Sequence, residues 1–158
     1  MHIRCWGSRG SIPVSGEPYL KYGGDTTCLE IRAGSGDLIL VDAGTGIRRC
    51  GNQLDSEGHP KYHLIFTHAH WDHILDVPDI VRNTGAKAYG SPNSCRLLEV
   101  CDIPQDKIQE VAAGDELELD GFGIEVLRSE HMKVPGFGPG PLSPDLRPPL
   151  RARDYCMD

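Results

Sequence analysis

Three histidines and an aspartate fall within seven positions, THAHWDH, at residues 67–73. This segment, which contains His68, His70, Asp72 and His73, directly follows the apolar residues 64–66. Polar groups at the end of a buried strand destabilise a fold unless they are paired or bind a cation. Imidazole nitrogen and carboxylate oxygen are ligands of zinc and similar ions. The spacing therefore predicts a metal site in this loop.

The order of these residues also indicates how many ions the loop serves. His68 and His70 are two positions apart, so both imidazoles can turn to one cation on an extended or looped backbone. Asp72 and His73 follow at the turn into an expected helix, where they can bind a second cation. Two ions about 3.5–4 Å apart clamp both oxygens of a displacement reaction. A lone His-x-His pair is common, but His-x-His-x-Asp-His after an apolar strand strongly indicates metal binding.

Strands and helices are expected to position this loop. Apolar density predicts strands over 2–7, 27–34, 38–46, 62–67 and 86–90. The glycine-containing turn between the second and third favours antiparallel pairing. Helical patterns cover 47–54, 72–85 with a break at Pro78, and 91–102. Three strand-like pieces follow within 108–131, and Asp120-Gly121 predicts a hairpin between the last two.

Bulk properties limit the class of protein. The 158 residues correspond to one domain, and the net charge of −7 argues weakly against non-specific nucleic-acid binding. The longest strongly apolar run is the four residues 38–41, so no membrane span or signal peptide is expected. The six cysteines include no C-x-x-C pair and are read as reduced thiols. We expect a cytoplasmic protein.

The loop resembles the hallmark His-x-His-x-Asp-His loop of the metallo-β-lactamase superfamily. The segments GSRGSIPV, YGGDTTCLEI and LILVDAGTGIR resemble the opening of its ribonuclease Z-like and phosphodiesterase-like branch. The resemblance extends over residues 1–131. It implies an α/β (α+β) fold, the metallo-β-lactamase αββα sandwich, of which this chain would supply the N-terminal half and the start of the second half.

The resemblance also assigns site residues. His68, His70 and His131 would bind one ion, and Asp72 with His73 would bind the second. Asp72 would be the catalytic residue that orients or deprotonates the attacking water, and Asp42 matches a structural aspartate beneath the loop. The implied cofactor is zinc, as one or two divalent ions, with manganese or iron as alternatives. Without the family pattern, His131 would be a surface histidine at a strand end.

Part of the family pattern is missing from this sequence. The pattern continues with an aspartate that bridges the two ions and with a further histidine, but no histidine follows His131. We therefore assign residues 1–133 to an incomplete metallo-β-lactamase-like domain and 134–158 to a Pro/Gly-rich loop or tail. Half a sandwich would expose an apolar sheet face. Either the sequence is a fragment, or another polypeptide completes it, or a reduced site works with one ion. For the lone chain we expect a homo-oligomer, or a second chain that completes the fold.

The predicted function is hydrolysis of a phosphodiester or other ester-like bond by a metal-bound hydroxide, on a small-molecule or phosphodiester substrate. A thioester hydrolase and an iron-dependent sulfur dioxygenase share the loop and are alternatives. A further alternative is a non-catalytic metal-binding remnant, or a subunit that needs a second chain. No membrane partner is expected, and a nucleic-acid partner is not indicated.

Overall fold

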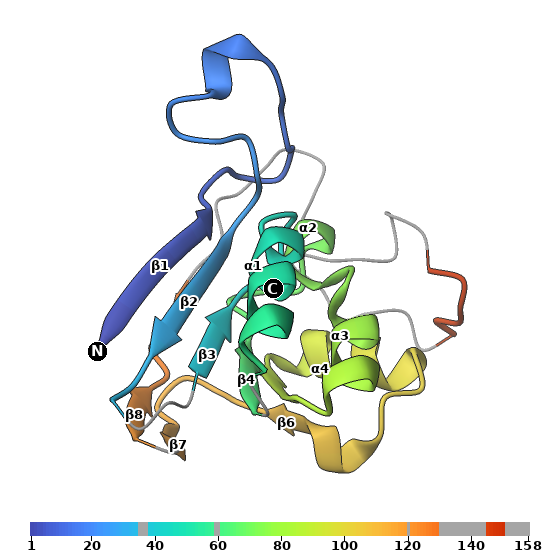
Figure 1. Cartoon of the computed structure of the whole chain (residues 1–158). Helices are drawn as coiled ribbons and strands as arrows, with labels where there is room; N and C mark the ends of the chain where they lie inside the picture. Colours follow the sequence, from blue (N-terminus) through green and yellow to red (C-terminus); the bar gives the residue numbers. More distant parts are fainter. Residues whose placement is uncertain (35–37, 59–60, 120, 130–144, 151–158) are drawn as a thin grey trace.

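The computed structural model describes residues 1–34, 38–58, 61–119, 121–129 and 145–150 (Figure 1). Within these residues the main sheet has six strands in the order β1-β2-β3-β4-β5-β6. They are β1 (His2–Gly7), β2 (Cys28–Arg32), β3 (Leu38–Val41), β4 (Tyr62–Ile65), β5 (Lys87–Gly90) and β6 (Ile108–Glu110). A separate two-stranded sheet consists of β7 (Glu116–Leu119) and β8 (Phe122–Glu125), which form the predicted hairpin.

The strand direction changes at β3. The first three strands pair antiparallel, as predicted for segments 27–34 and 38–46, and β3 to β6 pair parallel. Parallel neighbours end at the same edge of a sheet, and ligands in such sheets bind at the carboxyl ends of the strands. Val41 pairs with Ile65, so the residues that follow β3 lie beside the start of the histidine loop after β4.

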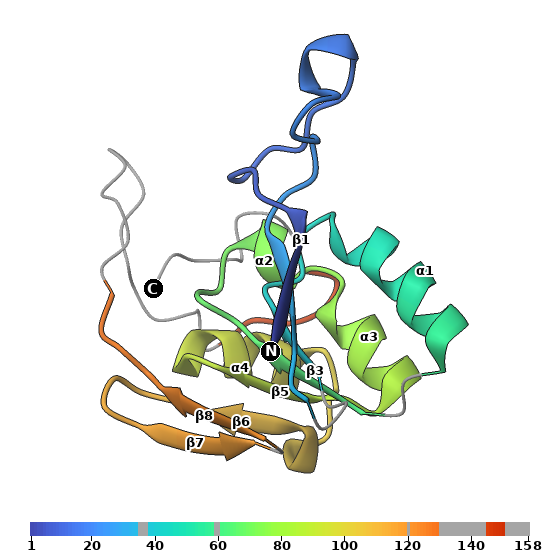
Figure 2. The ribbon, with the colours of Figure 1, turned by 60° about the vertical axis from the view of Figure 1, so that its left-hand side comes forward.

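The helices and the hairpin pack on opposite faces of this sheet (Figure 2). The helices are α1 (Ile47–Glu57), α2 (Trp71–Ile74), α3 (Val77–Thr84) and α4 (Pro92–Val100), with short 3-10 turns η1 (Glu17–Tyr19) and η2 (Gln105–Lys107). Successive strand residues point to opposite faces. Leu38, Leu40 and Leu64 therefore join the core beneath the helices, whereas Ile39 and Tyr89 contact the hairpin. The mixed sheet and helices confirm the predicted fold class.

Two helix boundaries differ from the prediction. The helix expected over 47–54 continues to Glu57, so the turn expected from Asp55 onward is wrong. It ends at Gly58, whose φ of 67° is a left-handed conformation that glycine adopts without strain. The break in 72–85 is confirmed, but it precedes Pro78, which lies in the first turn of α3. The N–H that proline lacks is not needed there.

Residues 145–150 belong to the segment that the sequence assigned to a loop or tail. Leu146 is 8% exposed and joins the core beneath the helices, where Leu150 packs against it. Residues 134–144 and 151–158 lie outside the described residues, so the boundary at 133 stays a prediction. In the described part of the chain, no helix is both long and apolar enough to cross a bilayer.

Candidate metal centre

Asp42 follows β3 and fixes the start of the histidine loop. The residue is 2% exposed. One carboxylate oxygen accepts a hydrogen bond from Thr67 N at 2.9 Å, and the other accepts from Thr67 Oγ1 at 2.8 Å. Its φ of 59° is uncommon for a residue other than glycine. This turn at the strand end, together with the two bonds, positions the carboxylate against the loop.

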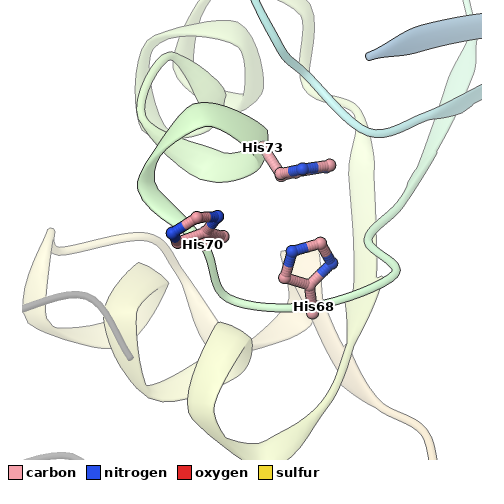
Figure 3. Close-up of side chains that lie close together, drawn as sticks. All are labelled: His68, His70 and His73. Carbon is pink, nitrogen blue, oxygen red and sulfur yellow. The ribbon is translucent and has the colours of Figure 1, made fainter. Parts of the chain in front are cut away.

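His68, His70 and His73 converge on a common space at this edge (Figure 3). His68 and His70 lie on the loop after β4, and His73 lies on the single turn α2. One ligand atom of each ring lies within 4.8 Å of those of the other two. The ring centroids of His68 and His73 are 4.2 Å apart. His73 N donates to His70 O at 2.9 Å, which closes the turn and brings the third ring back toward the loop.

Each of the three rings contacts a polar side chain through Nδ1. His73 Nδ1 lies 2.9 Å from Asp42 Oδ2, and His68 Nδ1 lies 3.0 Å from Thr67 Oγ1. His70 Nδ1 lies 3.2 Å from the hydroxyl of Ser11, which comes from the long segment between β1 and β2. Such contacts fix the orientation of histidines that bind metals. The backbone adds a further tie, because Ala43 N donates to His73 O at 2.9 Å.

The arrangement fits a divalent cation. Protonating one of three imidazoles this close together would place positive charge beside the other two, whereas a cation uses the lone pairs of neutral rings. Nitrogen donors suit zinc and also iron, so the donor set does not select one metal. His73 is buried at 7% exposure, and the other two rings are half-buried. The cluster is therefore partly open to solvent.

The structure brings three of the five predicted ligands together, namely His68, His70 and His73. Asp72 belongs to α2, but its side chain lies outside the described residues, and so does the whole of His131. The three described rings form one cluster. The assignment of His73 to a second ion, apart from His68 and His70, therefore stays a prediction.

Two residues that surround the cluster were not predicted. Thr67 contacts both Asp42 and His68, although it directly precedes the first histidine in the sequence. A threonine at the start of the loop could have indicated these contacts, since its hydroxyl can both donate and accept a hydrogen bond. Ser11 contacts His70 across 59 positions of sequence, and no spacing indicates that contact.

Comparisons with known proteins identify the family. Residues 22–147 match the family described as the Metallo-beta-lactamase superfamily. The ribonuclease Z of Methanopyrus kandleri is 29% identical over 104 residues, 61% of this chain and 37% of that protein. A metal-dependent hydrolase of Symbiobacterium thermophilum is 30% identical over 113 residues, 72% of this chain and 46% of that protein. The chain thus spans less than half the length of these curated relatives.

A solved structure shows the same fold. The crystal structure of Zn²⁺-bound PqqB from Methylobacterium extorquens aligns with a TM-score of 0.59 at 14% identity, covering 81% of this chain and 56% of that one. At this identity the likeness concerns the fold alone. The family match, however, covers most of the sequence and includes the histidine cluster. This chain belongs to the metallo-β-lactamase superfamily.

Proposed function

We propose that this protein is a hydrolase that uses divalent metal to cleave a phosphodiester or another ester-like bond. The observation that carries the proposal is the cluster of His68, His70 and His73 at the carboxyl edge of the sheet, with Asp42 against His73. Superfamily membership and the relative named metal-dependent hydrolase support hydrolysis. The relative named ribonuclease Z favours a phosphodiester.

Each residue of the site has its own role in the proposed reaction. His68 and His70 hold one ion, with His131 as a proposed additional ligand, and His73 binds the second ion. Asp72 is the proposed ligand of that second ion and the group that orients or deprotonates the attacking water. Asp42 Oδ2 lies 2.9 Å from His73 Nδ1, so the carboxylate favours a proton on that nitrogen and would leave the other ring nitrogen as the metal donor. When bound, zinc lowers the pKa of a coordinated water to about 7 and stabilises the negative charge of the reaction.

The proposal includes a partner that completes the fold, either a second copy or another chain. The described residues supply the first sheet and one hairpin of the second layer. On the edge strand β1, Ile3 remains 56% exposed. We also assign the protein to the cytoplasm, which the five free cysteines of the described residues support, since thiols stay reduced there.

A metal-loading and turnover experiment tests the function. Apoprotein is loaded with zinc, the bound metal is quantified, and hydrolysis of bis(p-nitrophenyl) phosphate is followed. We expect His68→Ala to lose both bound zinc and hydrolysis. His2→Ala, an exposed histidine on β1, is the matched control and should lose neither.

Other outcomes separate the alternatives. Zinc binding without turnover of the phosphodiester or of a thioester such as S-lactoylglutathione would favour the non-catalytic subunit. Preferential turnover of the thioester would favour the thioester hydrolase. Iron without zinc in the purified protein would overturn the hydrolase proposal in favour of the dioxygenase.

A further inference from the structure

A cavity of about 350 Å³ lies between α1 and α3, and its lining includes none of the three clustered histidines. The two helices lie side by side on the helical face of the sheet (Figure 2). A volume of this size falls within the range of small-molecule sites. Leu40, Ile47, Leu54 and Ile80 make the cavity apolar on the side of the core. It therefore offers an apolar floor to a ligand.

Charged and amide side chains line the rest of the cavity: Arg48, Asn52, Asp55, Asp76, Asp79 and Asn83. Three carboxylates thus face one guanidinium. Arg48 pairs with Asp76 at 3.5 Å, and Asp79 pairs with Arg82, which is not part of the lining. Asp55 has no ion-pair partner among the described residues. The uncompensated negative charge favours a positively charged ligand.

Tyr62 adds an independent sign of a ligand. The residue lines the cavity and is only 7% exposed. Its hydroxyl makes no hydrogen bond with any residue that the structure describes, and it is not sealed in the interior, so it is accessible from the cavity. Burial and the charge of Asp55 raise the pKa of Tyr62, so the hydroxyl stays protonated. An occupant of the cavity can supply the missing hydrogen bond.

Gly51 also lines the cavity, in the middle of α1. A glycine in a helix interior is less stable than an alanine. Here a Cβ would meet no atom within 4 Å, so no close approach of another segment requires the glycine. Its missing side chain does, however, leave the cavity wider.

We propose that the cavity between α1 and α3 binds a small organic cation, a protonated amine on an aromatic or alkyl body. The body packs on the apolar floor, and the ammonium donates hydrogen bonds to the carboxylate of Asp55 and the hydroxyl oxygen of Tyr62. A cation near the ring of Tyr62 is further stabilised by its π electrons. This binding is independent of the proposed hydrolysis, because the cavity and the histidine cluster share no residue.

Titration of the full chain with 2-phenylethylammonium, followed by ¹H–¹⁵N NMR, tests the proposal. The matched anion 3-phenylpropionate has the same ring and the opposite charge. We expect shifts in the amides of α1 and α3, and about fivefold tighter binding of the ammonium, the scale of a partly exposed charge contact. No shift at about 10 mM probe, beyond the range of weak binding, would overturn the proposal, and so would equal affinity for the two ions.

Variants locate the site. Asp55→Asn should weaken binding of the ammonium about fivefold, through loss of one partly exposed charge contact. Glu116→Gln removes the same charge from β7 on the other face of the sheet and should have no effect. Gly51→Leu fills the cavity and should abolish binding, whereas Gly51→Ala adds one methyl group and should retain it. Unchanged affinity in Asp55→Asn, or retained binding in Gly51→Leu, would overturn the assignment.

Discussion

Replacing Asp42 with asparagine tests whether the buried carboxylate sets the metal affinity of the histidine cluster. Asparagine has nearly the same shape and tolerates the φ of 59° at this position, so the backbone is preserved. The amide oxygen can still accept a hydrogen bond from Thr67 N. The amide nitrogen then replaces the oxygen that lies 2.8 Å from Thr67 Oγ1 and 2.9 Å from His73 Nδ1. The threonine hydroxyl can rotate to accept from the amide, but His73 Nδ1 loses its acceptor.

The magnitude follows from that single loss. A contact with a charged group at hydrogen-bonding distance, such as that of His73 Nδ1 with Asp42 Oδ2, contributes up to about 1.5–3 kcal/mol, which corresponds to about 10–100-fold in the dissociation constant. In the variant, His73 can accept from the amide only if its proton moves to the other nitrogen, the one that would bind the ion. We therefore expect zinc to bind Asp42→Asn about 10–100-fold more weakly, as for other outer partners of metal-binding histidines.

Calorimetric titration with zinc against a competing chelator measures the effect, and thermal unfolding of the apoprotein measures the stability separately. Asp106→Asn, an exposed position on η2, is the control for the loss of one carboxylate and should bind zinc as the parent does. An unchanged zinc affinity in folded Asp42→Asn would refute the reasoning. A lower unfolding temperature without a change in affinity would limit Asp42 to supporting the fold.

Three further predictions concern stability and assembly. Gly51→Ala should stabilise the protein by about 0.5–1 kcal/mol, or roughly 1–4 °C in thermal unfolding, because its added methyl group meets no atom. A hydrogen bond with the Cys50 side chain, together with burial, raises the pKa of the Cys28 thiol. The folded state then keeps a proton that the unfolded chain releases, so denaturant midpoints should fall as the pH rises above 9.0, and Cys28→Ala should reduce that fall. Light scattering should show self-association or a bound second chain, and a monodisperse monomer without other polypeptide would contradict the proposed completion of the fold.

The metal loop is predictable because its ligands are neighbours in the sequence and follow an apolar strand. The β7-β8 hairpin is predictable for a similar reason, since a two-residue turn is a local signal. The contact of Ser11 with His70 depends on the path of the whole segment between β1 and β2, which no local pattern encodes. Burial of Leu146 is unexpected for the same reason. Dense proline and glycine argue against regular structure but not against burial of one apolar side chain.

The histidine cluster depends on few elements, which explains why a chain spanning less than half of its relatives can present it. Asp42 and the three histidines lie on the segments that follow β3 and β4. The parallel pairing of these two strands, and the packing of Leu40 and Leu64 beneath the helices, position both segments. None of these contacts requires the second half of the family's fold. We therefore predict that a first ion binds without the second ligand set, which would join a cluster whose geometry β3 and β4 already define.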